Sequence, residues 1–270
     1  MTGVRPLFRV LRLQQFPVFH QLQIEEALLR ADSGNWCVIT DGAAPASIVM
    51  GIGGKPERLL NLSCVKERGT PVIRRFSGGG TVVLDENSLL VSLICNQPDI
   101  GVVAFPRNIM QWTESFYASV FQQHALVSGR FLLRENDYCI DDRKIGGNAQ
   151  CIIKDRWLHH TSFLWDFDPT SMELLSLPEK RPNYRMDRLH GDFLDRMNRF
   201  LPNKSSFLSG VLRELANRFH VKLATLEDLE DILRRPHHSG SRFVDVGSIY
   251  QSSLQKYAFC DVLLTVFCIL

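Results

Sequence analysis

The run Leu89–Cys95 (LLVSLIC) is the feature that most limits how this 270-residue chain can fold. Every residue of the run except Ser92 is apolar, so a strand built from it has no face suited to water. Such a strand belongs in the middle of a sheet that is covered on both sides. The chain is long enough for one large domain or two small ones, and its 45% hydrophobic content is ordinary for a globular protein.

Other strand-like and helical patterns surround this central run. The strand patterns fall at residues 7–13, 36–40, 47–52, 71–76, 80–85, 138–140, 144–145, 149–154 and 156–165. The helical patterns fall at residues 17–31 and 107–127 and along a stripe that includes Phe207, Val211 and Leu215, with Ser205 or Ser206 as the cap of this last helix. Because strands are concentrated before residue 166 and helices after it, we predict an α+β fold.

Charge and cysteine usage narrow the class of protein. The formal net charge is +2, and no cluster of basic residues interleaved with aromatic side chains is present, so we expect no nucleic-acid partner. The seven cysteines show no CxxC spacing, which favours reduced thiols over a disulfide framework or a zinc site. We therefore expect an intracellular protein and no metal held by the chain itself.

The two ends of the chain bear on its location. Arg5, Arg9 and Arg12 precede the first acidic residue, Glu25, as in a mitochondrial presequence, but residues 7–13 already read as a strand. A cytoplasmic location is therefore favoured and a mitochondrial one is the alternative. Ala258–Leu270 is apolar but shorter than the ~20 residues that span a bilayer, so we expect no membrane partner.

A glycine-rich segment, Arg74–Gly80 (RRFSGGG), joins two of the strand patterns. Three consecutive glycines cost conformational entropy, but they let main-chain N–H groups approach a ligand closely. Such a concavity suits a phosphate or carboxylate, and a neighbouring arginine adds charge-assisted hydrogen bonds. The alternative is a glycine-rich hairpin turn with two solvated arginines. The segment is not a P-loop, because no Gly-Lys-Ser/Thr follows it.

A second segment of interest places Lys144 between the charged turn at residues 141–143 and Gly146–Gly147. An amine held there can neutralise a substrate carboxylate or a developing oxyanion, and the alternative is a lysine that ends a hairpin strand. Further on, strand alternation puts His159 and Thr161 on one face and His160 and Ser162 on the other. One of these pairs can face a ligand; the alternative is a histidine bonded within the sheet.

Taken in order, four segments resemble the biotin/lipoate A/B protein ligase family, in its lipoate–protein ligase A branch: RRFSGGGTVVLD, REND, RKIGGNAQ and HHTSFL. The resemblance covers residues 7–200 and implies a mixed β-sheet flanked by helices, like the catalytic domain of a class II synthetase. It implies a catalytic domain over residues 1–235, followed by a C-terminal tail at 236–270 whose structure the sequence does not specify.

The resemblance also implies a reaction. Lipoate or octanoate is activated with ATP and Mg²⁺ as an acyl-adenylate such as lipoyl-AMP, and the acyl group passes to a lysine of a lipoyl domain. The expected acceptors are the E2 subunits of 2-oxoacid dehydrogenases and the H protein of glycine cleavage. By position, Lys144 is the catalytic residue. The binding residues are Arg75, Ser77, Gly78, Gly79, Gly80, Asn136, Asp137, Gly147, Ala149, His160, Ser162 and Arg185.

The chain departs from the family pattern in ways that leave other functions open. Leu84 stands where many relatives carry histidine, and the chain is short for the accessory domain of full ligases, so activation could need an accessory subunit. One alternative is a transferase that takes octanoyl or lipoyl groups from a carrier protein, through a thioester on Cys139 or Cys151. Another is a non-catalytic homologue that binds lipoyl domains.

Overall fold

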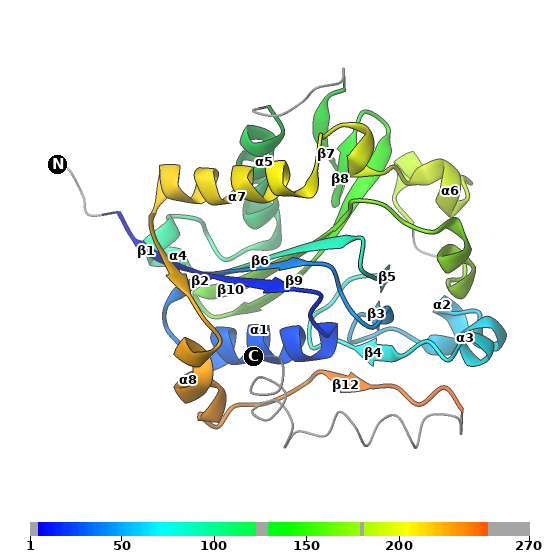
Figure 1. Ribbon diagram of the computed structural model, residues 1–270, viewed down its shortest axis with the longest axis horizontal. Helices are drawn as coiled ribbons and strands as arrows, with labels where there is room; N and C mark the ends of the chain where they lie inside the picture. Colours follow the sequence, from blue (N-terminus) through cyan, green and yellow to red (C-terminus); the bar gives the residue numbers. More distant parts are fainter. Residues whose placement is uncertain (1–4, 123–128, 179–180, 248–270) are drawn as a thin grey trace.

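The computed structural model describes residues 5–122, 129–178 and 181–247 and contains two β-sheets (Figure 1). Across the larger sheet the strands are β11 (His220–Ala224), β1 (Leu7–Gln14), β2 (Asn35–Asp41), β6 (Ser88–Asn96), β10 (Arg156–Leu164), β9 (Arg143–Ile153), β8 (Asp137–Ile140) and β7 (Phe131–Arg134). Across the smaller sheet they are β12 (Arg242–Phe243), β4 (Val72–Arg74), β3 (Ser47–Met50) and β5 (Thr81–Leu84). Both sheets combine parallel and antiparallel pairs, which confirms the predicted mixed sheet.

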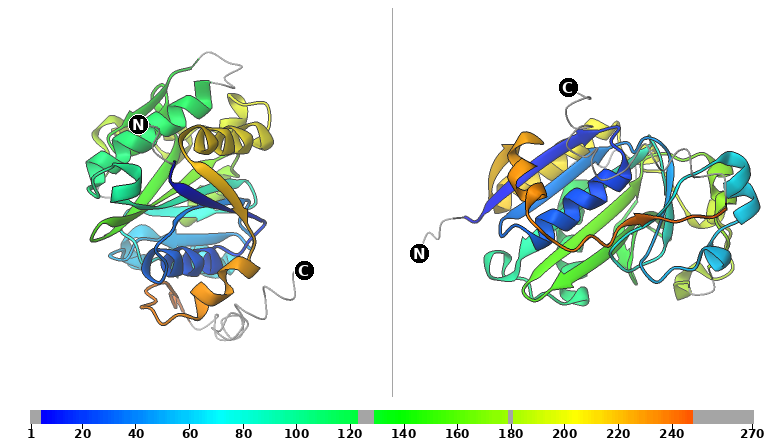
Figure 2. Two further views of the ribbon diagram at one scale, coloured as in Figure 1. Left: turned by 90° about the vertical axis from the view of Figure 1, so that its left-hand side faces the viewer. Right: turned by 90° about the horizontal axis from the view of Figure 1, so that it is seen from below.

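Helices cover both faces of the larger sheet: α1 lies on one face, and α5 and α7 lie on the other (Figures 1 and 2). The α-helices are α1 (Val18–Arg30), α2 (Pro56–Leu59), α3 (Leu62–Arg68), α4 (Gln97–Ile100), α5 (Pro106–Gln122), α6 (His190–Phe193), α7 (Lys204–Arg218) and α8 (Glu230–Arg234). The 3₁₀ helices are η1 (Pro169–Leu174), η2 (Asn183–Arg185), η3 (Met197–Arg199) and η4 (Glu227–Leu229). The expected α+β class is confirmed.

Strand β6 lies inside the larger sheet, between β2 and β10, as its two apolar faces predict. Its side chains feed two separate cores: Leu93 belongs to the core under α5 and α7, whereas Ile94 belongs to the core under α1. Ser92, the one polar residue of the run, is fully buried and donates a hydrogen bond to Glu25 of α1. Ser92 is therefore polar because it forms a hydrogen bond between the sheet and α1.

Three local predictions differ from the structure. The short strands expected at 144–145 and 149–154 are one continuous strand, β9, because Gly146 leaves room for the ring of Phe163 on β10 without ending the strand. The cap of α7 is Asn203, whose side chain accepts from the Ser206 amide, because the helix starts two or three residues earlier than predicted. Strand β11 was not predicted, since it is mostly exposed and lacks a clear apolar face.

The chain returns to the smaller sheet near its end. Strand β12 pairs with β4, and this segment runs beneath α1 (Figure 1). Part of the segment predicted as a C-terminal tail is therefore packed on the rest of the protein, and residues 248–270 lie outside the described residues, as do 123–127 of the helix predicted at 107–127. The domain boundary at residue 235 stays a prediction.

Candidate active site

The segment Arg75–Gly80, which we call the glycine loop, runs from β4 to β5. These strands flank β3 and do not pair with each other, so the loop is not a hairpin turn. It crosses the end of β3 closely: a Cβ at Gly51 would lie 2.2 Å from the carbonyl oxygen of Gly79. Gly79 has φ +101°, a conformation that other residues rarely adopt. Gly79 thus has a backbone reason for being glycine, whereas a Cβ at Gly78 or Gly80 would meet nothing within 4 Å.

Arg75 holds this loop from inside. Its guanidinium donates to the carbonyl oxygen of Gly78 at 2.7 Å and to that of Gly80 at 2.9 Å, and the side chain is buried. Burial lowers the pKa of Arg75 to about 10, and the negative charge of Glu25 acts in the opposite direction. Arg75 is therefore charged at neutral pH and braces the loop, and the ligand contact expected of it stays a prediction.

The outer side of the loop is free for a ligand. Gly78, Gly79 and Gly80 are exposed, and their N–H groups donate no hydrogen bond to another described residue. Neighbouring main-chain N–H groups without a protein acceptor are suited to bind anionic oxygen atoms. The loop lies against β9, since a Cβ at Gly79 would be 3.4 Å from the carbonyl oxygen of Asn148 and 3.7 Å from the side chain of Ala149.

Lys144 lies further along the same strand, β9. Its Nζ is 2.7 Å from Oδ1 of Asp137 on β8, and its side chain is 22% exposed. Gly147 leaves room for this amine, because a Cβ there would lie 3.1 Å from Nζ. Asn136, at the turn before Asp137, is tied to β9 through its carbonyl oxygen, which accepts from the side chain of Asn148 at 2.6 Å. The lysine and the asparagine–aspartate pair thus belong to one site.

The segment Arg181–Arg188 covers this part of β8 and β9. Tyr184 donates to Oδ2 of Asp137 at 2.9 Å, and burial together with the charge of Asp137 raises the pKa of this phenol, so the hydroxyl stays a donor. Arg188 donates to Asp142 at 3.1 Å. Arg185 is buried with its guanidinium 4.6 Å from the ring centroid of Phe193, and its Nη2 has no hydrogen-bond partner among the described residues.

His160 and Ser162 lie on β10, on the α1 side of the sheet. In register, His160 stands beside Ala149 and Ser162 beside Gly147. His160 Nδ1 is 3.0 Å from Glu25, which is fully buried. Burial raises the pKa of Glu25, but the charge of His160 and hydrogen bonds from His160, Ser92 and Gln21 outweigh it and leave the pKa below its usual value. His160 is thus bonded within the core and also borders the site.

On the opposite face of the sheet His159 and Thr161 point away from the candidate site, as alternation predicts. The hydroxyl of Tyr138 is 2.9 Å from Nε2 of His159, and Tyr117 donates to Thr161 at 3.1 Å. Burial lowers the pKa of His159 to about 3, with the charge of His160 adding to the effect, so this imidazole is neutral. The pair is part of the core.

The glycine loop, Asn136 and the pair His160 and Ser162 all neighbour β9. Arg185 belongs to the segment that covers β8 and β9, and the ligand contacts predicted for all these residues stay predictions. Glu25 and Tyr184 were missed by sequence analysis. A signal for Glu25 existed, because Gln21 and Glu25 lie one turn apart on the helix face that also carries Leu28. Tyr184 carries no such signal, since only the folded chain brings it to Asp137.

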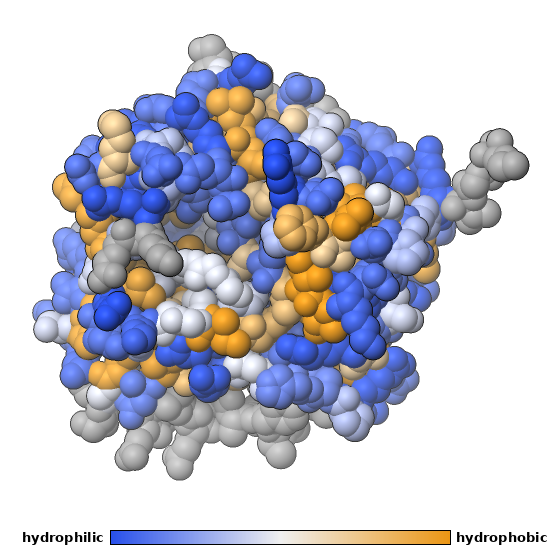
Figure 3. Space-filling model, turned by 180° about the vertical axis from the view of Figure 1, so that it is seen from behind, coloured by the Kyte–Doolittle hydropathy of each residue, from blue (hydrophilic) through white to orange (hydrophobic). Residues whose placement is uncertain are grey.

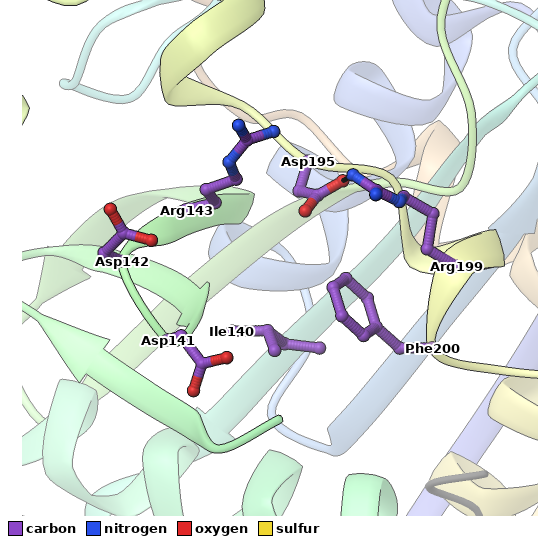
Figure 4. A pocket seen from close by; sticks show the side chains of 7 residues that line it. All are labelled: Ile140, Asp141, Asp142, Arg143, Asp195, Arg199 and Phe200. Atoms are coloured by element: carbon purple, nitrogen blue, oxygen red, sulfur yellow. Dashed lines mark hydrogen bonds and ion pairs between the residues drawn. The ribbon is translucent and has the colours of Figure 1, made fainter. Parts of the chain in front are cut away.

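A cavity of about 480 Å³ lies near Lys144, but none of the predicted binding residues lines it (Figure 4). It is lined by Ile140, Asp141, Asp142, Arg143, Asp195, Arg199 and Phe200. Its wall is tied to the lysine strand, because the Asp195 amide donates to the carbonyl oxygen of Lys144 at 2.8 Å. A second cavity of about 330 Å³ lies among β1, β2, β11 and α8. Neither of these two cavities is lined by the glycine loop or by Lys144.

Within the described ranges, no group of three or more His, Cys, Asp or Glu side chains is arranged to hold a metal ion. No helix in the same part of the chain has the length and apolar character to cross a membrane. On the face shown in Figure 3, hydrophobic residues form separate groups among hydrophilic ones.

Two mixed sheets flanked by helices are the fold that the sequence predicted for a lipoyl-ligase catalytic domain. Residues 17–204 match the family described as the lipoyl protein ligase A/B catalytic domain, and the chain belongs to this family. The resemblance seen in the sequence is thereby confirmed.

Two curated relatives differ in what their names say of activity. The "Inactive lipoate--protein ligase 2" of Plasmodium falciparum is 29% identical over 237 residues, covering 67% of this chain and 61% of its own length. Lipoate-protein ligase LplJ of Bacillus subtilis is 27% identical over 217 residues, covering 80% of this chain and 60% of its own length. The chain therefore spans about three fifths of the length of these relatives.

Solved structures support the fold. The bipartite lipoate protein ligase of Thermoplasma acidophilum, described with its E2 lipoyl domain, has a TM-score of 0.67 at 18% identity over 86% of this chain and 91% of its own. Lipoate-protein ligase A bound with ATP has a TM-score of 0.66 at 17% identity over 84% of this chain and 92% of its own. At these identities the likeness establishes the biotin/lipoate ligase fold alone.

Proposed function

We propose that this chain transfers a lipoyl or octanoyl group, by way of an acyl-adenylate, to a lysine of a lipoyl-domain protein. The observation that carries the proposal is the placing of Lys144 on the strand against which the glycine loop lies. An ammonium group and free main-chain N–H groups thereby border one open site. Fixed positive charge and N–H donors are what an anionic acyl phosphate and a developing oxyanion require.

The residues present fit an adenylate better than they fit a metal. The exposed N–H groups of Gly78, Gly79 and Gly80 and the unpartnered Nη2 of Arg185 are donors suited to phosphate oxygens. Asp137, expected to serve ATP or magnesium, is engaged by Lys144 and Tyr184. We therefore expect Mg²⁺ to arrive with ATP and to be held mainly by phosphate oxygens and water.

Lys144 is proposed to bind the carboxyl or phosphate oxygen atoms and to stabilise negative charge while the acceptor amine attacks. Its flexible side chain is proposed to turn from Asp137 to the bound ligand. Ser77, Gly147, Ala149, His160 and Ser162 are proposed to shape the acyl side of the site, since they lie on the loop, β9 and β10 around it. Asn136 is proposed to hold β8 and β9 together there.

The proposed acceptors are E2 subunits of 2-oxoacid dehydrogenases and the H protein of glycine cleavage. The Thermoplasma ligase of similar fold was described with an E2 lipoyl domain and as bipartite, which supports both this acceptor class and a separate activation subunit. The second candidate function is binding of lipoyl domains without catalysis, and it is favoured by the word "Inactive" in the name of the Plasmodium relative.

The thioester route through a cysteine has less support. Burial raises the pKa of the Cys139 thiol and of the Cys151 thiol, which disfavours the reactive thiolate. Cys139 is completely buried, and its Sγ lies 3.2 Å from the hydroxyl of Tyr184. An attacking thiolate needs access and a low pKa, and Cys139 has neither.

An intact-mass assay with a purified lipoyl domain tests the proposed function. The chain is mixed with the acceptor and one of three donors: lipoate with ATP, preformed lipoyl-AMP, or octanoyl-carrier protein. We expect one lipoyl group on the acceptor with lipoyl-AMP. Product with lipoate and ATP as well would show self-sufficient activation.

Each other outcome points to a defined alternative. Labelling only from octanoyl-carrier protein, with an acyl group trapped on a cysteine of this chain, would replace the ligase by a carrier-dependent transferase. A stable complex with the lipoyl domain but no acyl transfer from any donor would identify a non-catalytic binding protein.

A further inference from the structure

The segment 240–246, which we call the strap, lies beyond the part of the chain that matches the family, since that match ends at residue 204. Its strand β12 pairs with β4 so that Arg242 faces Arg74 and Phe243 faces Ile73. The Val244 amide donates to the carbonyl oxygen of Val72 at 2.8 Å. The strap thus extends the smaller sheet at the strand that leads directly into the glycine loop.

One end of the strap is fastened to α1 by a buried carboxylate. Glu26, with a side chain only 1% exposed, accepts the Gly240 amide at 3.0 and 2.9 Å and the Nε of Arg30 at 2.9 Å. A Cβ at Gly240 would lie 3.0 Å from Cβ of Phe76. Glycine therefore allows the strap to approach the loop this closely.

Ser241 makes the contact with the loop itself. Its Oγ accepts a hydrogen bond from the main-chain N–H of Phe76 at 3.2 Å, in a buried setting. Phe76 stands between Arg75, which braces the loop carbonyls, and Ser77, whose carbonyl oxygen accepts from the Ile52 amide at 3.0 Å. The serine side chain therefore continues the β12–β4 ladder by one residue, to the start of the glycine loop.

We propose that Ser241 and Gly240 are positioning residues that set the glycine loop in its ligand-binding conformation. They act through Phe76, because a backbone fixed at this residue aims the N–H groups that follow it. A site held rigidly before binding gives higher affinity than one ordered on binding. The proposal rests on the proposed function, which supplies an acyl-adenylate as the ligand of the loop.

The test compares Ser241→Ala with Ser241→Thr and with Ser239→Ala, an exposed serine just before the strap. Amide hydrogen exchange is followed in the peptide covering residues 72–80, and lipoyl-AMP affinity is measured by calorimetry on the full chain. Ser241→Ala should raise the exchange rate of that peptide and weaken lipoyl-AMP binding, each by about tenfold, because a buried N–H loses its acceptor. Ser241→Thr should restore both values, and Ser239→Ala should change neither. Transfer at saturating lipoyl-AMP should keep its kcat.

Faster exchange over the whole chain with unchanged lipoyl-AMP affinity would show a general structural role and overturn the proposal. Unchanged exchange at residues 72–80 would also overturn it. If Ser241→Ala fails to fold, Gly240→Ala takes its place, with the same expected changes from crowding against Phe76. If the unaltered chain binds no lipoyl-AMP, the proposed function fails, and the exchange measurement still decides whether the strap positions the loop.

Discussion

At the scale of single residues, the site depends on the contacts of Lys144 and Asp137. Its counter-ion, Asp137, is shared with the hydroxyl of Tyr184, so one carboxylate accepts from the lysine strand and from the segment that covers it. Lys144 contacts Oδ1 of Asp137 and Tyr184 contacts Oδ2, so a ligand oxygen that replaces Asp137 as the partner of Lys144 need not disturb the Tyr184 hydrogen bond. The amine can therefore move while the covering segment stays attached.

Lys144→Ala should abolish acyl transfer, with a fall in kcat of at least about a hundredfold, because fixed charge at a developing oxyanion is worth that much. The unfolding temperature should change little, since the side chain is partly exposed and its ion pair is correspondingly weak. Lys222→Ala on the edge strand β11 is the matched control and should keep full transfer. Normal turnover of Lys144→Ala in a mass-based transfer assay would remove this lysine from the mechanism.

At the scale of elements, the glycine loop is held from three sides. Arg75 braces its carbonyl oxygens, the Ile52 amide just beyond β3 donates to Ser77, and β9 lies against Gly79. The N–H groups of Gly78, Gly79 and Gly80 donate to no other described residue. The loop is therefore a preformed element whose conformation depends on neighbours from distant parts of the chain.

Gly79→Val should weaken lipoyl-AMP binding at least tenfold. A side chain there would need a φ near +101° and would place its Cβ 2.7 Å from the guanidinium of Arg75. Such strain costs about 1–3 kcal/mol, which the chain avoids by changing the loop. Gly53→Val is the control, because nothing lies within 4 Å of a Cβ at this position. Calorimetry gives both affinities, and equal values for the two variants would show that the loop takes no part in binding.

At the scale of the whole molecule, two neutral histidines, one buried and one half-buried, make stability depend on pH. Burial lowers the pKa of His159 to about 3, and burial with the charges of Arg185 and Lys144 lowers that of His190 to about 4. Unfolded histidine titrates near 6.5. The unfolded chain thus binds protons that the folded chain refuses, and stability falls as pH drops below about 6.5. Glu25, whose pKa is also lowered, acts in the same direction at lower pH.

His159→Gln should flatten this acid limb. Each such histidine contributes a slope of up to about 1.4 kcal/mol per pH unit between its unfolded and folded pKa values, and glutamine has no such proton to bind. Urea unfolding between pH 4 and 7 measures the slope, with the exposed His220→Gln as the control. A slope that is identical in His159→Gln and the unaltered chain would exclude His159 as a source.

The sequence alone was sufficient for the parts of this protein that depend on local pattern. The two-sided apolar run placed β6 inside a sheet, and the order of the glycine and lysine segments pointed to the family that residues 17–204 match. Apolar periodicity and runs of glycine depend on residues that are close in the sequence, so they can be recognised without knowing the fold.

Only the tertiary structure showed which residues far apart in the sequence form hydrogen bonds with each other. The pairing of Glu25 with His160, of Tyr184 with Asp137 and of Ser241 with Phe76 joins residues separated by 135, 47 and 165 positions. No local pattern encodes such contacts, because they arise where strands and segments far apart in the chain are packed together. The glycine loop and Lys144 could thus be found in the sequence, but what holds them in place could not.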